Sequence, residues 1–188
     1  MNIGVLALQG SVIEHVKMIS SINKKINVVQ VRTIDELASV DGLIIPGGES
    51  TTLRRLLDTF NLFTPIRERI IAGMPVWGTC AGLILLANKV EGEPAYFSAL
   101  DVDVRRNAYG RQIDSFVGEG DFDDMYINMV FIRAPKITRV GDGVTVLAEY
   151  NGEPVAVRQD NVLATAFHPE MTRDNRVHKY FINMIGKE

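Results

Sequence analysis

The chain has 188 residues, of which 46% are hydrophobic and 23% are charged, and its formal net charge is −3. This balance argues against a nucleic-acid partner, because phosphate binding needs a basic surface. No apolar run approaches the roughly 20 residues of a membrane helix, and the N-terminus lacks the pattern of a signal peptide. The single cysteine cannot form an internal disulfide, so we expect a cytoplasmic protein, with residues 1–188 as one domain.

The first half of the chain alternates strand and helix signals. Apolar, strand-like runs are expected at residues 2–8, 27–32, 42–46 and 74–79. Helices are expected at residues 11–24, 33–39, 51–60, 64–73 and 81–89. Ser11 with Glu14, and Thr33 with Glu36, have the spacing of capping boxes. Thr64 is expected to cap its helix.

The second half is strand-rich and ends in a helix. Strand-like segments cover residues 100–116, 129–135 and 144–167, and an amphipathic helix is expected at 173–187. Asn151-Gly152 is typical of a hairpin turn. Together the two halves predict a single-domain, three-layer α/β fold of flavodoxin-like type. Its sheet would be mostly parallel, with helices on both faces, and would gain antiparallel strands late in the chain.

The only cysteine, Cys80, lies where the strand ending at residue 79 meets the next helix. Gly78 and Gly82 flank it in a Gly-x-Cys-x-Gly frame, which is typical of a nucleophile elbow. Ligands of parallel sheets bind beyond the carboxyl ends of the strands, and helix N–H groups favour the thiolate form. A lone cysteine can equally be a small buried hydrophobe, so the frame alone leaves both interpretations open.

A thiol nucleophile needs an imidazole base and a group that orients this base. His15 is expected in the middle of a helix and His178 is expected to be solvated, whereas His168 follows an apolar strand. In an extended segment residues i and i+2 point to the same side, so Glu170 would reach the ring of His168. The order cysteine, histidine, glutamate predicts acyl transfer through a thioester. No third metal ligand accompanies the His-x-Glu pair, so no metal is expected.

A tetrahedral intermediate needs N–H donors around its oxygen. The N–H of Ala81, next to the cysteine, is one candidate. The other donor would come from the segment "PGGEST", residues 46–51, in which Gly47 and Gly48 have the freedom to turn an N–H into the site. The alternative is an ordinary Gly-Gly turn before a helix.

Three motifs, "PGGEST", "GTCAG" and "FHPE", resemble in order and spacing those of class I, triad-type glutamine amidotransferases. The segments "LALQG", "RNAYGRQIDSF" and "FIRAP" narrow the resemblance to the glutaminase subunits of pyridoxal 5′-phosphate synthase. Residues 118–129 give no functional signal.

The resemblance implies hydrolysis of L-glutamine to L-glutamate and ammonia without a cofactor. Cys80 would be the nucleophile and His168 and Glu170 would complete the triad, while Gly48 and Ala81 would form the oxyanion hole. The residues that would bind glutamine are Gly48, Glu49, Ser50, Arg106, Ile132 and Arg133.

The resemblance also implies a partner: a synthase subunit that receives the ammonia and makes pyridoxal 5′-phosphate, the active form of vitamin B6. Two alternatives stay open. The chain could be the glutaminase subunit of another synthase, such as imidazole glycerol phosphate synthase. It could also be a DJ-1-like redox module that hydrolyses nothing and uses Cys80 as a sensor or a structural residue.

Overall fold

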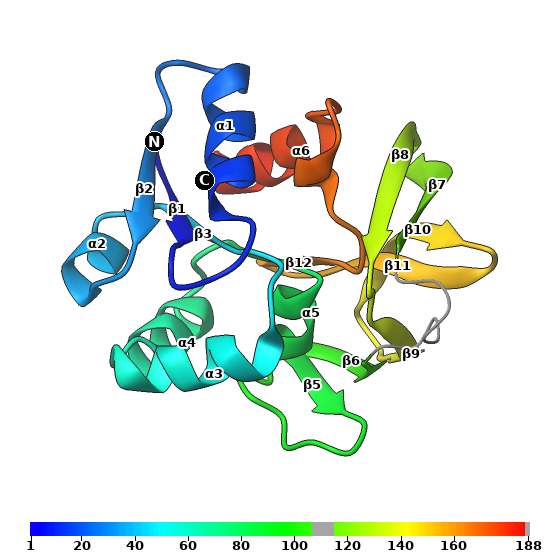
Figure 1. Cartoon of the computed structure of the whole chain (residues 1–188), viewed down its shortest axis with the longest axis horizontal. Helices are drawn as coiled ribbons and strands as arrows, with labels where there is room; N and C mark the ends of the chain where they lie inside the picture. Colours follow the sequence, from blue (N-terminus) through cyan, green and yellow to red (C-terminus); the bar gives the residue numbers. More distant parts are fainter. Residues whose placement is uncertain (107–114, 187–188) are drawn as a thin grey trace.

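The computed structural model describes residues 1–106 and 115–186, and these residues form two sheets and their covering helices (Figure 1). Within the described residues the larger sheet has nine strands, in the order β2-β1-β3-β4-β12-β11-β10-β7-β8. In that order the strands are β2 (Asn27–Val31), β1 (Asn2–Leu6), β3 (Gly42–Ile45), β4 (Val76–Thr79), β12 (Val162–Thr165), β11 (Glu153–Gln159), β10 (Thr145–Tyr150), β7 (Ser115–Phe122) and β8 (Met125–Ile132). From β2 to β12 the neighbours are parallel, and the later pairs are antiparallel.

Helices cover both faces of the parallel part of this sheet. They are α1 (Val12–Ile22), α2 (Ile34–Ala38), α3 (Ser50–Thr59), α4 (Phe63–Ile71), α5 (Ala81–Leu86), α6 (Arg176–Ile185) and the short 3₁₀ helix η1 (Pro169–Met171). Figure 1 shows α1 and α6 on one face and α3, α4 and α5 on the other. Every residue of β3, β4 and β12 is buried, as expected for strands covered on both sides. The predicted α/β class is confirmed.

A smaller sheet, absent from the sequence-based prediction, joins β5 (Ala87–Val90), β6 (Leu100–Arg105) and β9 (Lys136–Val140). The helix expected over residues 81–89 stops at Leu86, because the chain becomes extended at Ala87 and β5 pairs in parallel with β6. Pairing with a distant strand has overridden the local helical preference. The strand-like segment expected over residues 100–116 contains β6 and the start of β7, and its residues 107–114 lie outside the described residues.

Local signals had mixed outcomes. The capping box of Thr33 and Glu36 is present, with both reciprocal hydrogen bonds. The predicted cap at Thr64 is wrong, because α4 begins at Phe63 and Leu62 occupies the cap position. The Asn151-Gly152 turn joins β10 to β11 as predicted, with φ angles of +53° and +76°. Residues 118–129, which carried no functional signal, form most of the β7–β8 hairpin.

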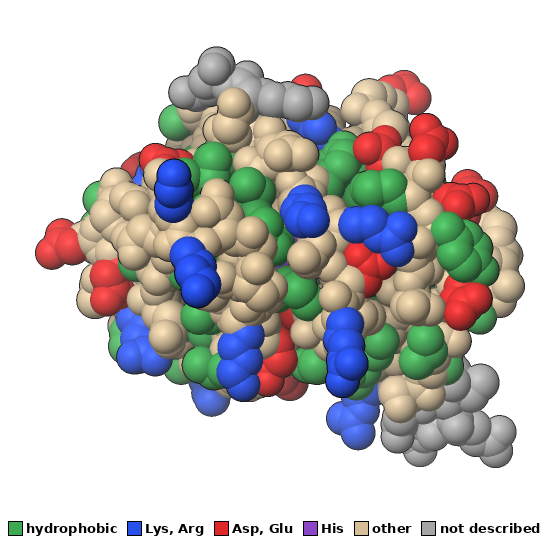
Figure 2. Space-filling view, turned by 90° about the horizontal axis from the view of Figure 1, so that it is seen from above, with side chains coloured by type: hydrophobic (Ala, Val, Ile, Leu, Met, Phe, Trp, Pro, Cys, Tyr) green, Lys and Arg blue, Asp and Glu red, His purple; other side chains and the backbone are tan. Residues whose placement is uncertain are grey.

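The face that carries α1 and α6 is seen in Figure 2. Lysine and arginine side chains are spaced apart on it, and acidic side chains gather toward the end formed by the antiparallel strands. No histidine reaches this face, and each of the three histidines is at most 5% exposed. Among the described residues, no helix combines the length and the apolar character of a membrane span.

Candidate active site

Cys80 occupies the sharp corner between β4 and α5. Its φ is +48°, in the left-handed region that non-glycine residues rarely adopt and that is concentrated at functional sites. A methyl group on Gly78 would lie 2.4 Å from the carbonyl carbon of Gly82, and one on Gly82 would lie 2.2 Å from the carbonyl oxygen of Ile45. Only glycine at these two positions lets α5 approach the sheet so closely. The elbow geometry predicted from the Gly-x-Cys-x-Gly frame is present.

His168 and Glu170 lie beside this corner, beyond the end of β12. The Nδ1 atom of His168 lies 2.7 Å from Oε1 of Glu170, and the backbone N–H of His168 donates to the carbonyl of Val130 on β8. Both side chains are buried, and the imidazole faces Cys80. Because Nδ1 is engaged by the carboxylate, Nε2 is the ring nitrogen left for the thiol.

The backbone that brings Glu170 to His168 differs from the prediction. We expected an extended segment, but residues 169–171 form η1, and this turn carries the carboxylate back to the imidazole. The capping role predicted for Ser11 is also wrong. Its hydroxyl is turned toward Glu170 and donates to Oε1 at 2.6 Å, a charge-assisted hydrogen bond, and its oxygen accepts from no N–H of α1.

The protonation states of the pair follow from their surroundings. Burial by itself lowers the pKa of His168, but hydrogen bonding to Cys80 and Glu170 and the charges of these groups raise it to about 10. Burial by itself would raise the pKa of Glu170, but the imidazoles of His15 and His168 and the Ser11 hydroxyl lower it to about 2. At neutral pH the carboxylate is therefore ionised and holds the Nδ1 proton of His168.

The Gly47–Gly48 segment, which follows β3, covers the sulfur and the imidazole. The N–H of Gly47 donates to the Thr79 hydroxyl at 2.8 Å, and its carbonyl accepts from the N–H of Ser11 at 3.0 Å. A methyl group on Gly47 would lie 2.3 Å from Cε1 of His168 and 3.4 Å from Cβ of Cys80. The glycine is thus wedged against two of the three groups and leaves no room for a side chain.

The Gly47→Ala variant should remain folded but lose at least about tenfold in activity, because its new methyl displaces the imidazole from the thiol. Gly47 has no positive φ, so the clash with His168 is the expected cause. Gly186→Ala is the matched control, since the nearest atom of the described residues to a methyl there is Cε of Met1, at 3.6 Å. Steady-state hydrolysis and thermal unfolding of both variants provide the measurement. Full activity in Gly47→Ala would contradict this account of the loop.

Beyond Gly48 the segment enters α3 through a hydrogen-bonded corner. Oε1 of Gln9, a residue of the "LALQG" motif, accepts from the N–H of Glu49 at 2.9 Å. The carboxylate of Glu49 caps α3, and hydrogen bonds from the Thr52 side chain and from the backbone of residues 51 and 52 lower its pKa to about 2. Ser50 is buried, and among the described side chains nothing partners its hydroxyl.

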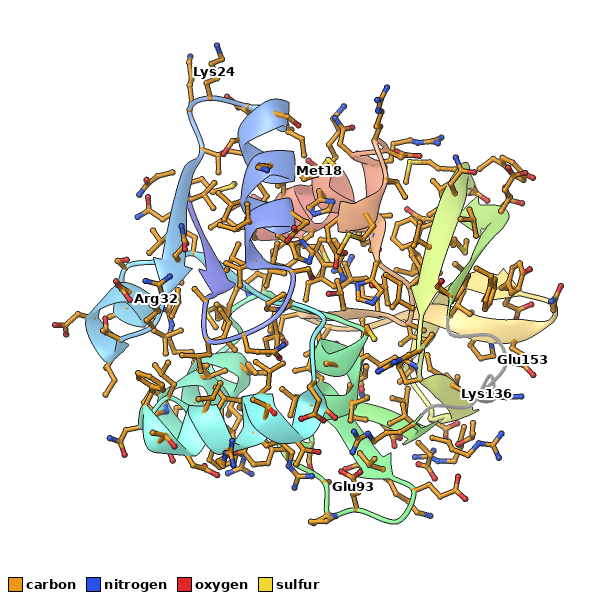
Figure 3. All side chains as sticks on the ribbon, viewed as in Figure 1. Met18, Lys24, Arg32, Glu93, Lys136 and Glu153 are labelled. Atoms are coloured by element: carbon orange, nitrogen blue, oxygen red, sulfur yellow. The ribbon has the colours of Figure 1, made fainter. Side chains whose placement is uncertain are left out.

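Arg106 is tied to this corner by ion pairs. It contacts Oε1 of Glu49 at 3.2 Å and also pairs with Glu93, a residue that the sequence did not suggest. Figure 3 shows Glu93 on the segment that follows β5. At the end of β8, the carbonyl of Ile132 lies 3.7 Å from the sulfur of Cys80, and Arg133 follows with φ at +45°. Ile132 therefore lies at the thiol, whereas Arg106 belongs to the Glu49 corner.

Two of the buried histidines were not expected at the site. The prediction that His178 is solvated is wrong: it is 1% exposed and packs edge-on against Trp77, with ring centroids 4.8 Å apart. His15 is fully buried in α1. A helical period would have indicated this, because His15 shares a face with the buried Val12 and Ile19. In the part of the chain that the structure describes, no group of three or more His, Cys, Asp or Glu side chains could hold a metal ion.

At the carboxyl edge of the parallel sheet a cysteine elbow and a histidine–glutamate pair meet, which is the arrangement expected of a thiol nucleophile with its base. The comparisons with known proteins specify the family. The model of the SNO glutamine amidotransferase family matches residues 5–187, and the chain belongs to this family. The resemblance noted in the sequence is confirmed.

Curated relatives match over nearly their full length. The pyridoxal 5′-phosphate synthase subunit PdxT of Mycobacteroides abscessus is 53% identical, over 97% of this chain and 96% of that protein. The subunit of the same name from Clostridium botulinum is 49% identical, over 98% and 97%. A solved glutamine amidotransferase superposes with a TM-score of 0.91 at 41% identity, covering 98% of each chain. PurLQS from Thermotoga maritima, with a TM-score of 0.70 at 14% identity and 97% coverage of each chain, shares the fold alone.

Proposed function

We propose that this protein hydrolyses L-glutamine to L-glutamate and ammonia, and delivers the ammonia to a synthase subunit that makes pyridoxal 5′-phosphate. One observation carries the proposal: in a member of this family, Cys80, His168 and Glu170 converge in one buried corner beneath Gly47. The match over residues 5–187 supports treating the whole chain as one amidotransferase domain.

The proposed reaction follows from the positions of these groups. Nε2 of His168 takes the proton of the thiol, and the sulfur of Cys80 attacks the carboxamide carbon of glutamine. The N–H groups of Gly48 and Ala81 stabilise the oxyanion that forms. His168 then protonates the leaving nitrogen, the C–N bond breaks, and ammonia departs from a thioester. Water, deprotonated by His168, attacks the thioester and releases glutamate and the thiol.

The amino-acid end of glutamine would bind Gly48, Glu49, Ser50, Arg106, Ile132 and Arg133. Its α-ammonium needs an acceptor and its α-carboxylate needs N–H donors or a cation. The unpartnered hydroxyl of Ser50 and the carboxylate of Glu49 support the placement of this end at the start of α3. No cofactor is required for amide hydrolysis by this route.

Delivery to a partner is supported by chemistry and by the relatives. Ammonia released into water at neutral pH is largely protonated and is no longer a nucleophile, so a protected transfer favours a complex. The PdxT proteins to which this chain is similar are named as subunits of pyridoxal 5′-phosphate synthase. A cytoplasmic location, suited to the free thiol of Cys80, completes the proposal.

The decisive experiment is ammonia and glutamate release from glutamine, with and without the pyridoxal 5′-phosphate synthase subunit. We expect slow release alone and a clear rise on addition of this subunit. A rise only with imidazole glycerol phosphate synthase would reassign the partner. Diazo-oxo-norleucine, a glutamine analogue that alkylates, should label Cys80; no label even with the synthase subunit present would favour the redox interpretation.

A further inference from the structure

A pair of imidazoles, those of His15 and His178, lies next to the carboxylate of the proposed triad. Nε2 of His15 is 3.5 Å from Oε2 of Glu170 and 3.4 Å from the hydroxyl of Thr79, while its Nδ1 is 2.9 Å from Nε2 of His178. His15 and His178 are 0% and 1% exposed, and Trp77 packs edge-on against both rings. A continuous line of polar contacts therefore runs from α6 through α1 to the carboxylate and on to His168.

The charges around His15 decide which of its nitrogens carries the proton. Oε1 of Glu170 already accepts from Ser11 and His168, whereas Oε2 makes no hydrogen bond to the described residues and has Nε2 of His15 as a neighbour at 3.5 Å. A bare Nε2 lone pair facing this buried carboxylate would be repelled, so the proton belongs on Nε2 of His15. Nδ1 of His15 is then an acceptor, and His178 must donate from its own Nε2.

The unpaired atom of the cluster agrees with this assignment. With the proton of His178 on Nε2, its Nδ1 is an unpaired acceptor, and Nδ1 is indeed the buried atom of His178 that has no hydrogen-bond partner among the described residues. If both histidines had the opposite tautomer, Nδ1 of His178 would be a buried N–H donor without an acceptor. The carboxylate of Glu170 would then face the lone pair on Nε2 of His15. Buried polar groups without partners are costly, and the first arrangement has fewer conflicts.

We propose that His15 is a positioning residue for the triad: its Nε2–H holds Oε2 of Glu170, and His178 fixes the His15 tautomer that makes this possible. The inference rests on the proposed glutaminase function. Glu170 would then be held on both oxygens, by Ser11 and His168 on one side and by His15 on the other. A carboxylate fixed in this way keeps the imidazole of His168 aimed at the thiol.

Both supporting imidazoles stay neutral. The groups that face His15 are Glu170 and His168 near the thiol, His178 on α6 and Glu14 on its own helix. Burial lowers the pKa of His15 and outweighs the carboxylate of Glu170, which raises it, and burial together with the nearby His15 lowers the pKa of His178 well below its usual value. A neutral donor leaves the negative charge of Glu170 for His168, whereas a charged His15 would compete for it.

Two substitutions of His15 test whether this residue positions Glu170 or only fills space in the core. The amide nitrogen of glutamine can occupy the place of Nε2, and the shorter asparagine reaches only the place of Nδ1. Measured with the synthase subunit, His15→Asn should lower kcat about tenfold to a hundredfold with little change in KM, the effect of losing a hydrogen bond to a charged group. His15→Gln should retain most of the activity.

The dependence of kcat on pH distinguishes a positioning role from a packing role, because a loss of packing alone would not shift it. Without the Nε2–H donor the pKa of Glu170 rises, and the ionised carboxylate is the form that orients His168. The acid limb of kcat should therefore move to higher pH in His15→Asn and stay in place in His15→Gln. Equal losses in both variants, or an unchanged acid limb in a folded His15→Asn, would overturn the proposal.

A measurement on the unaltered protein covers the case in which a variant does not fold. Nitrogen-15 NMR of labelled histidines should show His15 as the neutral Nε2–H tautomer from pH 6 to 8. An Nδ1–H tautomer, or titration of His15 in this range, would overturn the inference whatever the activity. Absence of glutamine hydrolysis by the parent complex would instead refute the proposed function, so the two failures are distinguishable.

Discussion

The Cys80→Ala variant is expected to lose glutamine hydrolysis by at least about 10⁴-fold, because removal of a nucleophile leaves only binding and oxyanion stabilisation. The sulfur is the only thiol in the chain, and it lies beside the imidazole at the elbow. The fold should persist, since alanine removes one buried atom and keeps the backbone donor that bonds to Thr165. Ammonia release with the synthase subunit, together with a binding measurement, tests both parts.

Cys80→Gly is the informative companion of this variant. It is equally inactive, but glycine adopts the positive φ of this corner without strain, so unfolding should cost about 1 kcal/mol more than for Cys80→Ala. Chemical denaturation measures the difference. Residual hydrolysis near the parental rate in either variant would remove Cys80 from the mechanism, and a less stable glycine variant would refute the strain at the elbow.

The His168→Asn variant should lose about 10³-fold or more in kcat, because an amide cannot take the proton of the thiol or return it to the leaving nitrogen. Asparagine places its amide near the position of Nδ1, so the hydrogen bond to Glu170 and the packing of the segment should survive. The measurement is single-turnover hydrolysis with the synthase subunit, along with labelling of Cys80 by diazo-oxo-norleucine, which should slow in parallel.

A graded comparison tests the roles within the triad. Glu170→Ala should retain more activity than His168→Asn, because the carboxylate orients the imidazole and does not exchange protons with the substrate. Its stability should fall, since Ser11 and His15 lose the buried acceptor that they face. Activity of Glu170→Ala equal to that of the parent would show that the third member is misassigned.

The parallel half of the fold and the candidate triad could be predicted because their signals are local. Apolar runs separated by helical patterns indicate the first strands, and the Gly-x-Cys-x-Gly frame marks the elbow at Cys80. The His-x-Glu spacing of residues 168 and 170 predicted their contact, although a 3₁₀ turn and not an extended strand makes it.

What could not be predicted depends on residues that are distant in the chain. Strand β5 exists because β6 pairs with it, and no pattern within residues 87–90 indicates that partner. Ser11 has the spacing of a capping box, yet its hydroxyl is taken by a carboxylate 159 residues away. The contact between His15 and His178 could not be predicted either, because it forms only where α1 and α6 meet over Trp77.

The close approach of α5 to the sheet has a consequence for how this protein tolerates change. Gly78, Gly82 and Ile45 touch through main-chain atoms, so the place of the sulfur is determined by polypeptide geometry and hardly at all by neighbouring rotamers. Substitutions among the surrounding aliphatic side chains should therefore lower the melting temperature well before they lower kcat. Any side chain at Gly78 or Gly82, by contrast, should abolish activity in a single substitution, because it would clash with main-chain atoms at the elbow.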